Sequence, residues 1–563
     1  MLVYIQVKNV EEAKKAEIAI EKAAPIWYNV IDKKTNPKEE ELLIHMLRNN
    51  GNKQLNFYST LYQNIPKNHI LKSINSAISF EFVNKLLEDR YCKNFGRPAK
   101  EPELMIKLLM LQHLYNLSDE RVILATQTDL AFMWFIGINP DDTLPHHSLL
   151  SKFRTMRLQG LALDDILSEV IRQCVEKQII NAENGWSIDT THVHANTVKK
   201  TPERIMKHLA KKIFKAMCRD DYDIPDYKHI ADHKEARHMM KDYLEGVMSS
   251  AESVATNEVT EANEILTSPL FMEQKGIRSI SDKDARVGYK SRTESFYGYK
   301  MEYGLTTEGQ LITSVGVHSG AYVDGSEFSE LLKQGRQAGL KINSVYADKA
   351  YFKKDILKEL KASGTAAYIP VSASSYRIDE DMFSYNKDSD EWICVRGNRS
   401  VSKKTVQKKQ KGRKPSTVYM YRFDKKDCTD CPLRDDCIKG RKAKARSLSV
   451  GDYAGEYYQH SQWAKTQEFI EEYMKRASIE WKNAEMKRFH GLARARGFGL
   501  PSITRQAKLT ALAVNLKKIV TLIGQKEKEN SIKIVFSTQF DTFFGRVFFS
   551  RLFWDKRRWM RTV

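Results

Sequence analysis

Cysteine is scarce in this sequence, and long apolar runs are missing from it. Seven cysteines in 563 residues are too few for a secreted disulfide scaffold, so we expect a protein of the reducing cytoplasm. No stretch reaches about 18 apolar residues, because polar side chains such as Lys107 and Gln112 interrupt the longest candidate, and we therefore expect no membrane partner. The opening residues, MLVYIQVKNVEEAKK, also lack the apolar centre of a secretory signal.

Basic residues, by contrast, are abundant. Lys and Arg number 91 against 71 Asp and Glu, which gives a formal net charge of +20 at pH 7. The composition is otherwise that of a folded protein, with 42% hydrophobic and 29% charged residues, and it excludes a mainly disordered chain. The length suggests about two to four domains. The charge favours a polyanionic partner, although many basic proteins bind nothing specific.

The first part of the chain is expected to be helical. After a charged helical segment at 1–50, residues 51–160 carry apolar side chains at helical spacing, most clearly in Glu101–Tyr115, where four leucines lie close to one face. A basic stretch, HHSLLSKFR at 146–154, follows two prolines and predicts a short helix. Helices that are joined by tight turns and end in a basic helix suit a helix-turn-helix DNA-binding domain, with Arg154 as a DNA contact. An ordinary helical packing domain is the alternative.

The second part alternates between strands and helices. We expect strands at 186–189, 296–304, 311–318, 344–348 and 366–369, and helices at 326–338, 353–361, 457–490 and 503–524. This order predicts an α/β protein whose mixed sheet has helices on its faces, and it is also the order of the RNase H-like fold. The core would then comprise 184–370 and 451–525, with a charged helical insertion at about 200–275.

Two aspartates end strands of that predicted sheet. Asp189 follows the first strand, in SIDTTHVHANT, and Asp348 closes the fourth, in SVYADKAY. An open sheet places its ligands at the carboxyl ends of its strands, and in this order the first and fourth strands are neighbours. We therefore expect the two carboxylates to converge. Each aspartate taken alone also fits a solvated strand end.

One predicted helix face carries polar groups of several kinds. Side chains three or four residues apart share one face of a helix. That spacing joins Tyr473, Arg476, Glu480, Asn483 and Lys487. Such a face is either a solvated surface with an Arg476–Glu480 pair or a face turned into an active site. In the second case Glu480 would complete a three-carboxylate metal site, and Arg476 and Lys487 would hold phosphates.

Residues 371–450 interrupt the core with a Cys-rich, basic insertion. It holds four of the seven cysteines, Cys394, Cys428, Cys431 and Cys437. Cys-x2-Cys is a usual zinc half-site, so a structural zinc ribbon is one interpretation and free thiols are the other. The cations of this insertion, among them Lys411 and Arg413, suit either a phosphate-binding surface or a solvated loop. A basic, aromatic tail follows at 526–563.

These motifs together resemble a known family. The Y-R-E-K signature of bacterial insertion-sequence DDE transposases is reproduced by Tyr473, Arg476, Glu480 and Lys487. DTTHVHANT at Asp189 and YADKAY at Asp348 resemble the first and second acidic motifs of that family. FGRPAKEPELMIKLLMLQHLYNLSDERV and LPHHSLLSKFR resemble its N-terminal helical domain, so the similarity extends over roughly residues 55–524.

The resemblance implies a DNA transposase with an RNase H-like catalytic core that cuts and joins the ends of an insertion sequence. Asp189, Asp348 and Glu480 would hold two Mg²⁺ ions, with Mn²⁺ able to substitute, while Tyr473 and Arg476 would contact the terminal strand. The implied partners are double-stranded DNA, both terminal inverted repeats and target, and further copies of the chain in a dimer or higher oligomer. A structure-specific nuclease on the same core and a decayed or domesticated DNA-binding protein are the alternatives.

Overall fold

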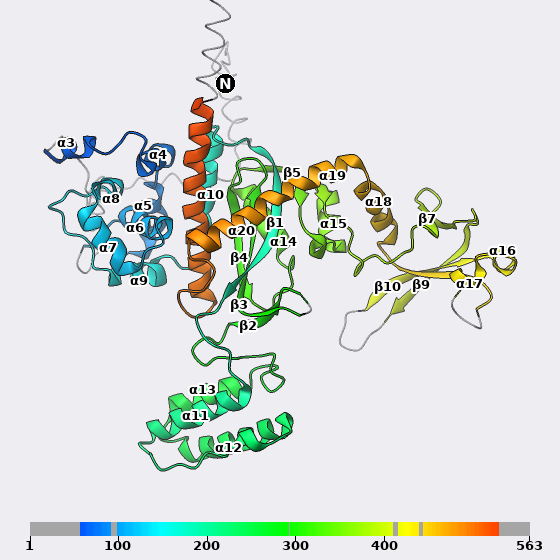
Figure 1. Ribbon diagram of the computed structural model, residues 1–563, viewed down its shortest axis with the longest axis horizontal. Helices are drawn as coiled ribbons and strands as arrows, with labels where there is room; N and C mark the ends of the chain where they lie inside the picture. Colours follow the sequence, from blue (N-terminus) through cyan, green and yellow to red (C-terminus); the bar gives the residue numbers. More distant parts are fainter. Residues whose placement is uncertain (1–56, 92–97, 292, 409–414, 439–442, 529–563) are drawn as a thin grey trace, which may run out of the picture.

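The structure, a computed structural model, describes residues 57–91, 98–291, 293–408, 415–438 and 443–528. The segment expected at 1–50, the cations Lys411 and Arg413, and the tail from 529 onward lie outside these residues. A mixed sheet occupies the centre, with a helical region on one side and a β-rich insertion on the other (Figure 1). Among the described residues, none of the helices is long and apolar enough to cross a membrane.

The central sheet is built from six strands. In chain order they are β1 (Glu183–His194), β2 (Arg286–Tyr289), β3 (Ser295–Thr306), β4 (Ile312–Ser319), β5 (Lys341–Tyr346) and β6 (Ala366–Tyr368). β3 pairs antiparallel with β1, β2 and β4, whereas β5 pairs parallel with β1 and β6. The order β4-β3-β1-β5-β6, with the short β2 beside the start of β3, confirms the predicted RNase H-like mixed sheet. The sequence does not predict β2, because four residues are too few to show a strand pattern.

Trp186 specifies how β1 sits in this sheet. Its indole is fully buried, donates from Nε1 to Thr313 Oγ1 on β4 at 2.9 Å, and packs edge-on against Phe328. The ring passes so close to Gly304 of β3 that a Cβ there would lie 2.1 Å from an indole carbon. A one-residue slip would turn Trp186 to the other face and bring a larger residue into that space, so the indole and the glycine select one register together.

Helices cover both faces of the sheet. α10 (Ala162–Glu176) and α14 (Phe328–Gln337) pack against β4 on the face that holds Trp186. Side chains alternate along a strand, so Asp189, three residues after Trp186, lies on the opposite face. α20 (Ala477–Phe489) crosses β1 on that side and therefore covers Asp189.

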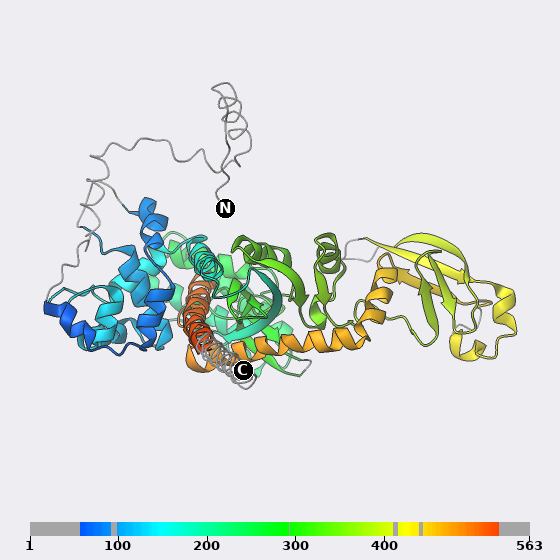
Figure 2. The same ribbon diagram turned by 90° about the horizontal axis from the view of Figure 1, so that it is seen from above.

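The helical region before α10 surrounds one central helix. Its helices are α3 (Phe57–Gln63), α4 (Ile70–Ala77), α5 (Phe82–Leu87), α6 (Pro102–Leu114), α7 (Asp119–Thr128), α8 (Leu130–Ile136) and α9 (Ser148–Lys152). α6 is buried on all sides rather than along the single face its leucines predict, because α5, α7 and α8 all pack against it. A helix over 500–528 lies between this region and the sheet (Figure 2), where Asn515 exchanges two hydrogen bonds with the backbone of Ile312.

Two insertions extend from the core (Figure 1). The first follows β1 and consists of α11 (Pro202–Ala216), α12 (His233–Ala251) and α13 (Thr256–Leu266), which share a hydrophobic core of their own. The second forms two small sheets from β7 (Phe383–Asn386), β8 (Glu391–Cys394), β9 (Ser400–Lys408), β10 (Ser416–Phe423) and β11 (Ser447–Gly451). Both insertions leave the order of the central strands intact.

The long helix predicted over 457–490 is divided in the structure. α18 (Ala454–Ala464) ends before α19 (Gln467–Tyr473), whose first turn is capped by the Thr466 hydroxyl accepting from the Phe469 N–H. A 3₁₀ turn at Met474–Arg476 then leads into α20. The predicted helix is interrupted because Thr466 caps a new helix within the helical pattern. The chain therefore changes direction before α20 reaches the sheet.

Candidate active site

Asp189 and Asp348 lie at equivalent positions in the register of two neighbouring strands. The expectation that Asp189 ends its strand was wrong, because β1 continues to His194, whereas Asp348 follows the end of β5 by two residues. In the parallel β1–β5 pair, Ser187 lies opposite Tyr346, and each aspartate follows two residues later. Neighbouring strands lie about 4.8 Å apart, so this register brings the two carboxylates to the same edge of the sheet. The Asp348 side chain also accepts from the Ala350 N–H at 2.8 Å, which fixes it at the start of a short 3₁₀ turn.

Asp189 is a largely buried carboxylate, with only 16% of its side chain exposed. Its Oδ2 accepts from Asn483 Nδ2 at 3.3 Å, and a guanidinium nitrogen of Arg476 lies 3.5 Å from the same oxygen. Burial raises the pKa of Asp189 to about 6; Arg476 opposes this shift, and the carboxylates of Asp348 and Asp324 add to it. A carboxylate that has lost its water and faces other acids is stabilised by any cation that binds beside it.

Buried polar contacts hold α20 over this edge. The Tyr303 hydroxyl on β3 lies 3.1 Å from the Ile479 carbonyl and 3.0 Å from Asn483 Oδ1. Because Asn483 donates in turn to Asp189, one amide links β3, α20 and β1. One turn further along α20, Lys487 Nζ lies 3.3 Å from His192 Nδ1. These contacts fix the distance between α20 and the sheet at the aspartates.

Glu480 stands apart from the two aspartates. Its side chain is 65% exposed and pairs with Arg476 at 3.1 Å across one helical turn. Since Arg476 also contacts Asp189, a single guanidinium lies between the two acids. Helical spacing alone would group the polar side chains together, but the structure turns Asn483 and Lys487 toward β1 and leaves Glu480 on the outside.

The basic and aromatic groups beside the acids are partly desolvated. Burial and the nearby Lys290 lower the pKa of Lys487 to about 8. Burial and Lys487 lower the pKa of His192 to about 4, so this imidazole is a neutral partner near pH 7. Burial also raises the pKa of Tyr473, which stacks on Phe469. Arg476 and Lys487 thus bring positive charge to the edge where the aspartates meet.

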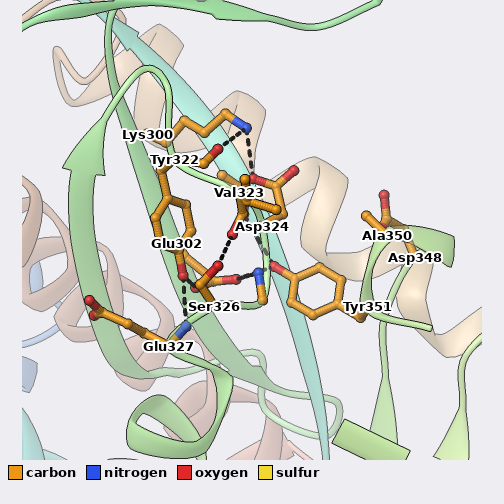
Figure 3. Close-up of polar contacts among 12 residues, drawn as sticks. Lys300, Glu302, Tyr322, Val323, Asp324, Ser326, Glu327, Asp348, Ala350 and Tyr351 are labelled. Carbon is orange, nitrogen blue, oxygen red and sulfur yellow. Dashed lines mark hydrogen bonds and ion pairs between the residues drawn. The ribbon is translucent and has the colours of Figure 1, made fainter. Parts of the chain in front are cut away.

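A buried carboxylate that sequence reasoning missed supports this edge from within the sheet (Figure 3). Glu302 of β3 is fully buried and accepts from the hydroxyls of Tyr322 and Tyr351, both at 2.6 Å, and from the Gly325 N–H at 2.7 Å. The available signal was a glutamate in the aromatic strand FYGYKMEYG, where a charge is out of place. Its three donors explain how the charge is tolerated there.

This carboxylate connects the segments that carry the two aspartates. Tyr351 lies three residues after Asp348, and its hydroxyl is also 3.1 Å from Oγ1 of Thr190, the neighbour of Asp189. Both aspartate-bearing segments therefore contact one phenol, which Glu302 holds in place. The loop between β4 and α14 is held by the same carboxylate.

Asp324, on that loop, is paired within the fold. Its Oδ1 lies 2.8 Å from Lys300 Nζ (Figure 3), and Lys353 donates to its backbone carbonyl. Asp324 therefore adds negative charge near Asp189 but already has a lysine partner.

The acid edge offers hard oxygen ligands in an open arrangement. Among the described residues, no three His, Cys, Asp or Glu side chains come close enough together to hold a metal. Asp189 and Asp348 nevertheless present the carboxylate oxygens that Mg²⁺ prefers, and Asp189 is short of counter-charge. The chemistry of these donors fits a divalent cation between the two strands.

The four cysteines of the insertion gather around one small cavity. A space of about 30 Å³ is lined by Cys394, Cys428, Cys431 and Cys437, together with Phe383 and Phe423. All four are free thiols, and burial raises the pKa of Cys437. The Arg446 N–H also points at Cys428 Sγ from 3.5 Å. The fold thus brings Cys394 to the other three, although in the part of the chain described no three thiols are at metal-binding distance.

Arg154, the DNA contact expected from sequence, is engaged within the helical region. Its guanidinium donates to both carboxylate oxygens of Asp119, at 2.8 and 2.5 Å, and to Gln112 Oε1 at 3.2 Å. Although burial alone would raise it, the pKa of Asp119 is lowered by these bonds. The charge of Arg154 is therefore largely balanced by its own domain.

Two family models match the chain. One, described as a transposase domain (DUF772), matches residues 59–156, and the other, described as a transposase DDE domain, matches residues 393–520. No curated protein matches. A solved piggyBac transposase synaptic complex with hairpin DNA is similar at 9% identity and a TM-score of 0.30, over 82% of this chain and 75% of that one. A likeness this low adds nothing to the assignment.

The two matched domains define the class, and the protein is a transposase of the DDE type. It is a DNA-cleaving enzyme of a class that works with divalent metal ions. The DDE match contains the four cysteines of the insertion, α20 with Glu480 and Lys487, and most of the 500–528 helix, while Asp189 and Asp348 lie before it. The transposase predicted from the motifs is thereby confirmed as a class, and the individual catalytic residues rest on motif and geometry.

Proposed function

We propose that this transposase cuts and rejoins the ends of its element at the sheet edge that carries Asp189 and Asp348, with Glu480 as the third acid. The observation that carries the proposal is the β1–β5 register, because it sets side by side two carboxylates from distant parts of the chain. The desolvation of Asp189 supports it, since a cation would relieve that cost. Two Mg²⁺ ions, or Mn²⁺ in their place, suit these donors.

The position of each residue indicates its proposed role. When bound, the two ions would activate the attacking oxygen and stabilise the leaving oxygen of the phosphodiester. Asp189, on the central strand, would hold the ions together with Asp348 and Glu480. Glu480 can join them only after its pair with Arg476 opens. The freed guanidinium of Arg476 would then contact a phosphate oxygen, for which its planar fork is suited.

The remaining members of the Y-R-E-K pattern are proposed to hold the DNA end. Lys487 is partly buried beside His192, so it would meet a phosphate as a positioned point charge. Tyr473, half-buried beside Phe469, offers an aromatic face to an unpaired base. The substrates would be the terminal inverted repeats and a target duplex, held by a dimer or larger assembly in a reducing, cytoplasmic setting.

Replacing Asp348 by Asn should remove strand cleavage and leave DNA binding unchanged. The substitution keeps the size of the side chain but removes a metal-binding charge, and we expect a loss of at least about 10²-fold, as for other groups that stabilise transition-state charge. The measurement is cleavage of a labelled duplex that carries an element end, read from the DNA flanking the gene. Asp355→Asn, an exposed aspartate on α15 (Lys354–Ala362), is the matched control. Cleavage by Asp348→Asn at the wild-type rate would show that Asp348 is not a ligand.

The cysteine cavity is proposed to hold a structural Zn²⁺, with free thiols as the alternative. Support comes from the convergence of all four cysteines on one space. Freshly purified protein should contain about one Zn²⁺ per chain, because zinc binding and folding are coupled in such modules. Cys431→Ser should lose the metal and make residues 390–440 more sensitive to protease, whereas Cys218→Ser, an exposed thiol in the helical insertion, should do neither. Metal analysis that finds no zinc would leave the free-thiol interpretation.

A further inference from the structure

A cleft lies away from the aspartates, between the helical region and the catalytic core. Its volume is about 750 Å³, and it is lined on one side by residues of α6, α7 and α9 and on the other by residues 495–509. Four arginines line this cleft, Arg121, Arg154, Arg496 and Arg505. We call it the arginine cleft. Arg121 and Arg154 come from the helical region, while Arg496 and Arg505 come from the core.

Positive charge in the arginine cleft exceeds what the protein itself neutralises. Asp119 is the one carboxylate among its lining residues in the described chain, and Arg154 already occupies both of its oxygens. Within the described residues, the guanidinium of Arg496 donates to neutral acceptors, Asn116 Oδ1 at 2.6 Å and the Leu117 carbonyl at 3.4 Å. Arg505 makes no ion pair with any described residue.

The arginines are close enough to disfavour one another's charge. Partial burial and the charge of Arg154 lower the pKa of both Arg496 and Arg505. The free protein therefore carries an electrostatic cost that an anion entering the arginine cleft would remove. Guanidinium groups bind phosphate oxygens through paired hydrogen bonds, and the hydroxyl of Ser151 adds a neutral donor to the same lining.

The arginine cleft is attached directly to the strand that carries Asp189. The His194 N–H donates to the Ala493 carbonyl at 3.0 Å, and the Ala495 N–H donates to the His194 carbonyl at 2.8 Å, so the loop before Arg496 is bound to the end of β1. From Asp189 to His194 the strand covers about 17 Å at 3.3 Å per residue. Lys487 contacts His192, which lies between Asp189 and His194 on this strand.

We propose that the arginine cleft binds the phosphate backbone of the element DNA away from the cleavage site, with Arg496 and Arg505 as the main contacts. This inference rests on the proposed function, because it takes the acid edge as the place of cleavage. It also assigns the helical region a role shared with the core: DNA contacts come from both sides of the cleft. Arg154 mainly binds Asp119 and so fixes the conformation of the helical-region residues that line the arginine cleft.

The test uses the full-length protein and two labelled duplexes, one with an element end and one of random sequence. The double variant Arg496→Ala/Arg505→Ala should bind both more weakly, and its slope of log affinity against log salt should be smaller by about two, since each phosphate contact contributes about 0.9. Arg496→Lys/Arg505→Lys should keep most of the slope. Arg219→Ala, an exposed arginine in the helical insertion, should bind like the wild type.

Thermal stability separates a binding role from a structural one. Removing like charges should offset the loss of the Arg496 bonds to Asn116 and Leu117, so the DNA-free double variant should melt close to the wild-type temperature. A mainly structural role would lower its melting temperature clearly. Inorganic sulfate should stabilise the wild type more than the double variant. An unchanged salt slope would overturn the proposal, even if sulfate still protects the wild type, because the arginine cleft would then hold small anions only.

A failure of the proposed function would look different. If Asp189→Ala cleaved DNA at the wild-type rate, the acid edge would be wrong, and the position of the contact relative to the cut would have no meaning. The change in salt slope would still show whether Arg496 and Arg505 bind backbone. Conversely, loss of cleavage in Asp189→Ala together with normal binding by Arg496→Ala/Arg505→Ala would overturn only the arginine cleft.

Discussion

Asp189→Asn should abolish strand cleavage and at the same time leave the metal-free protein at least as stable as the wild type at neutral pH. Asp189 is largely buried, and burial raises its pKa to about 6, so its charged form costs free energy in the folded state. Asparagine has nearly the same shape and no charge, and it can still accept from Asn483. A group retained at a stability cost is typical of a functional site.

The pH dependence of this cost has a defined sign. The carboxyl has a pKa of about 6 in the folded protein against an ordinary value of 3.8, so the folded state binds more protons between those pH values. The stability contributed by Asp189 is therefore greatest below about pH 4, falls as the pH rises to about 6, and stays low above it. The difference amounts to at most about 3 kcal/mol, because a shift of one pKa unit corresponds to about 1.4 kcal/mol.

Urea unfolding of both proteins in EDTA, from about pH 4 to pH 7, measures this difference. The wild-type minus variant stability should become more negative across that range, which isolates Asp189 from other groups that titrate there. Added Mn²⁺ should then stabilise the wild type and not Asp189→Asn. Asp355→Asn should follow the wild type throughout. A variant that is less stable than the wild type at every pH, and that still responds to Mn²⁺, would contradict the assignment of Asp189 as a desolvated metal ligand.

The sequence was most informative where a single acid interrupts an apolar strand pattern. Asp189 and Asp348 each end an apolar run, and the strand order alone makes their strands neighbours, so their convergence could be predicted. Glu480 was harder, because helical spacing fixes a face but not a rotamer. The structure shows it paired with Arg476 at the surface, a choice set by two side chains and the 3₁₀ turn before α20.

Features that need distant segments to meet were beyond the sequence. Arg154 could be singled out as a basic residue, but its partner Asp119 and its neighbours Arg496 and Arg505 come from three other elements. The position of α6 at the centre of its region was equally hidden, since a helix surrounded by others shows no polar face to read. In both cases the deciding interactions are tertiary.

Glu302→Ala should strongly destabilise the core. It would leave the hydroxyls of Tyr322 and Tyr351 and the Gly325 N–H without their acceptor, and it would open a cavity next to β1. Unsatisfied buried donors and lost packing together should cost on the order of 3–5 kcal/mol. Urea or thermal unfolding measures the change, and Glu330→Ala, an exposed glutamate on α14, is the matched control.

Glu302→Gln separates stability from positioning. The amide oxygen can still accept from Tyr351 and Gly325, but its NH₂ group would face the Tyr322 hydroxyl, which already accepts from the Glu327 N–H. One charge-assisted bond is lost, for about 1–3 kcal/mol, and the protein should remain folded. Tyr351 follows Asp348 by three residues and contacts Thr190, the neighbour of Asp189, while Glu302 holds its hydroxyl. We therefore expect a lower cleavage rate at saturating DNA and a higher Mn²⁺ requirement, with DNA affinity unchanged.

Tyr351→Phe tests the same link from the other side, since it removes only the hydroxyl that joins Thr190 to Glu302. If Glu302 positions the aspartates through this phenol, Tyr351→Phe and Glu302→Gln should slow cleavage to a similar degree, and the double variant should be little worse than either single one. Additive losses would mean that the two residues act separately. Full cleavage by both folded variants would show that the buried carboxylate serves the stability of the sheet alone.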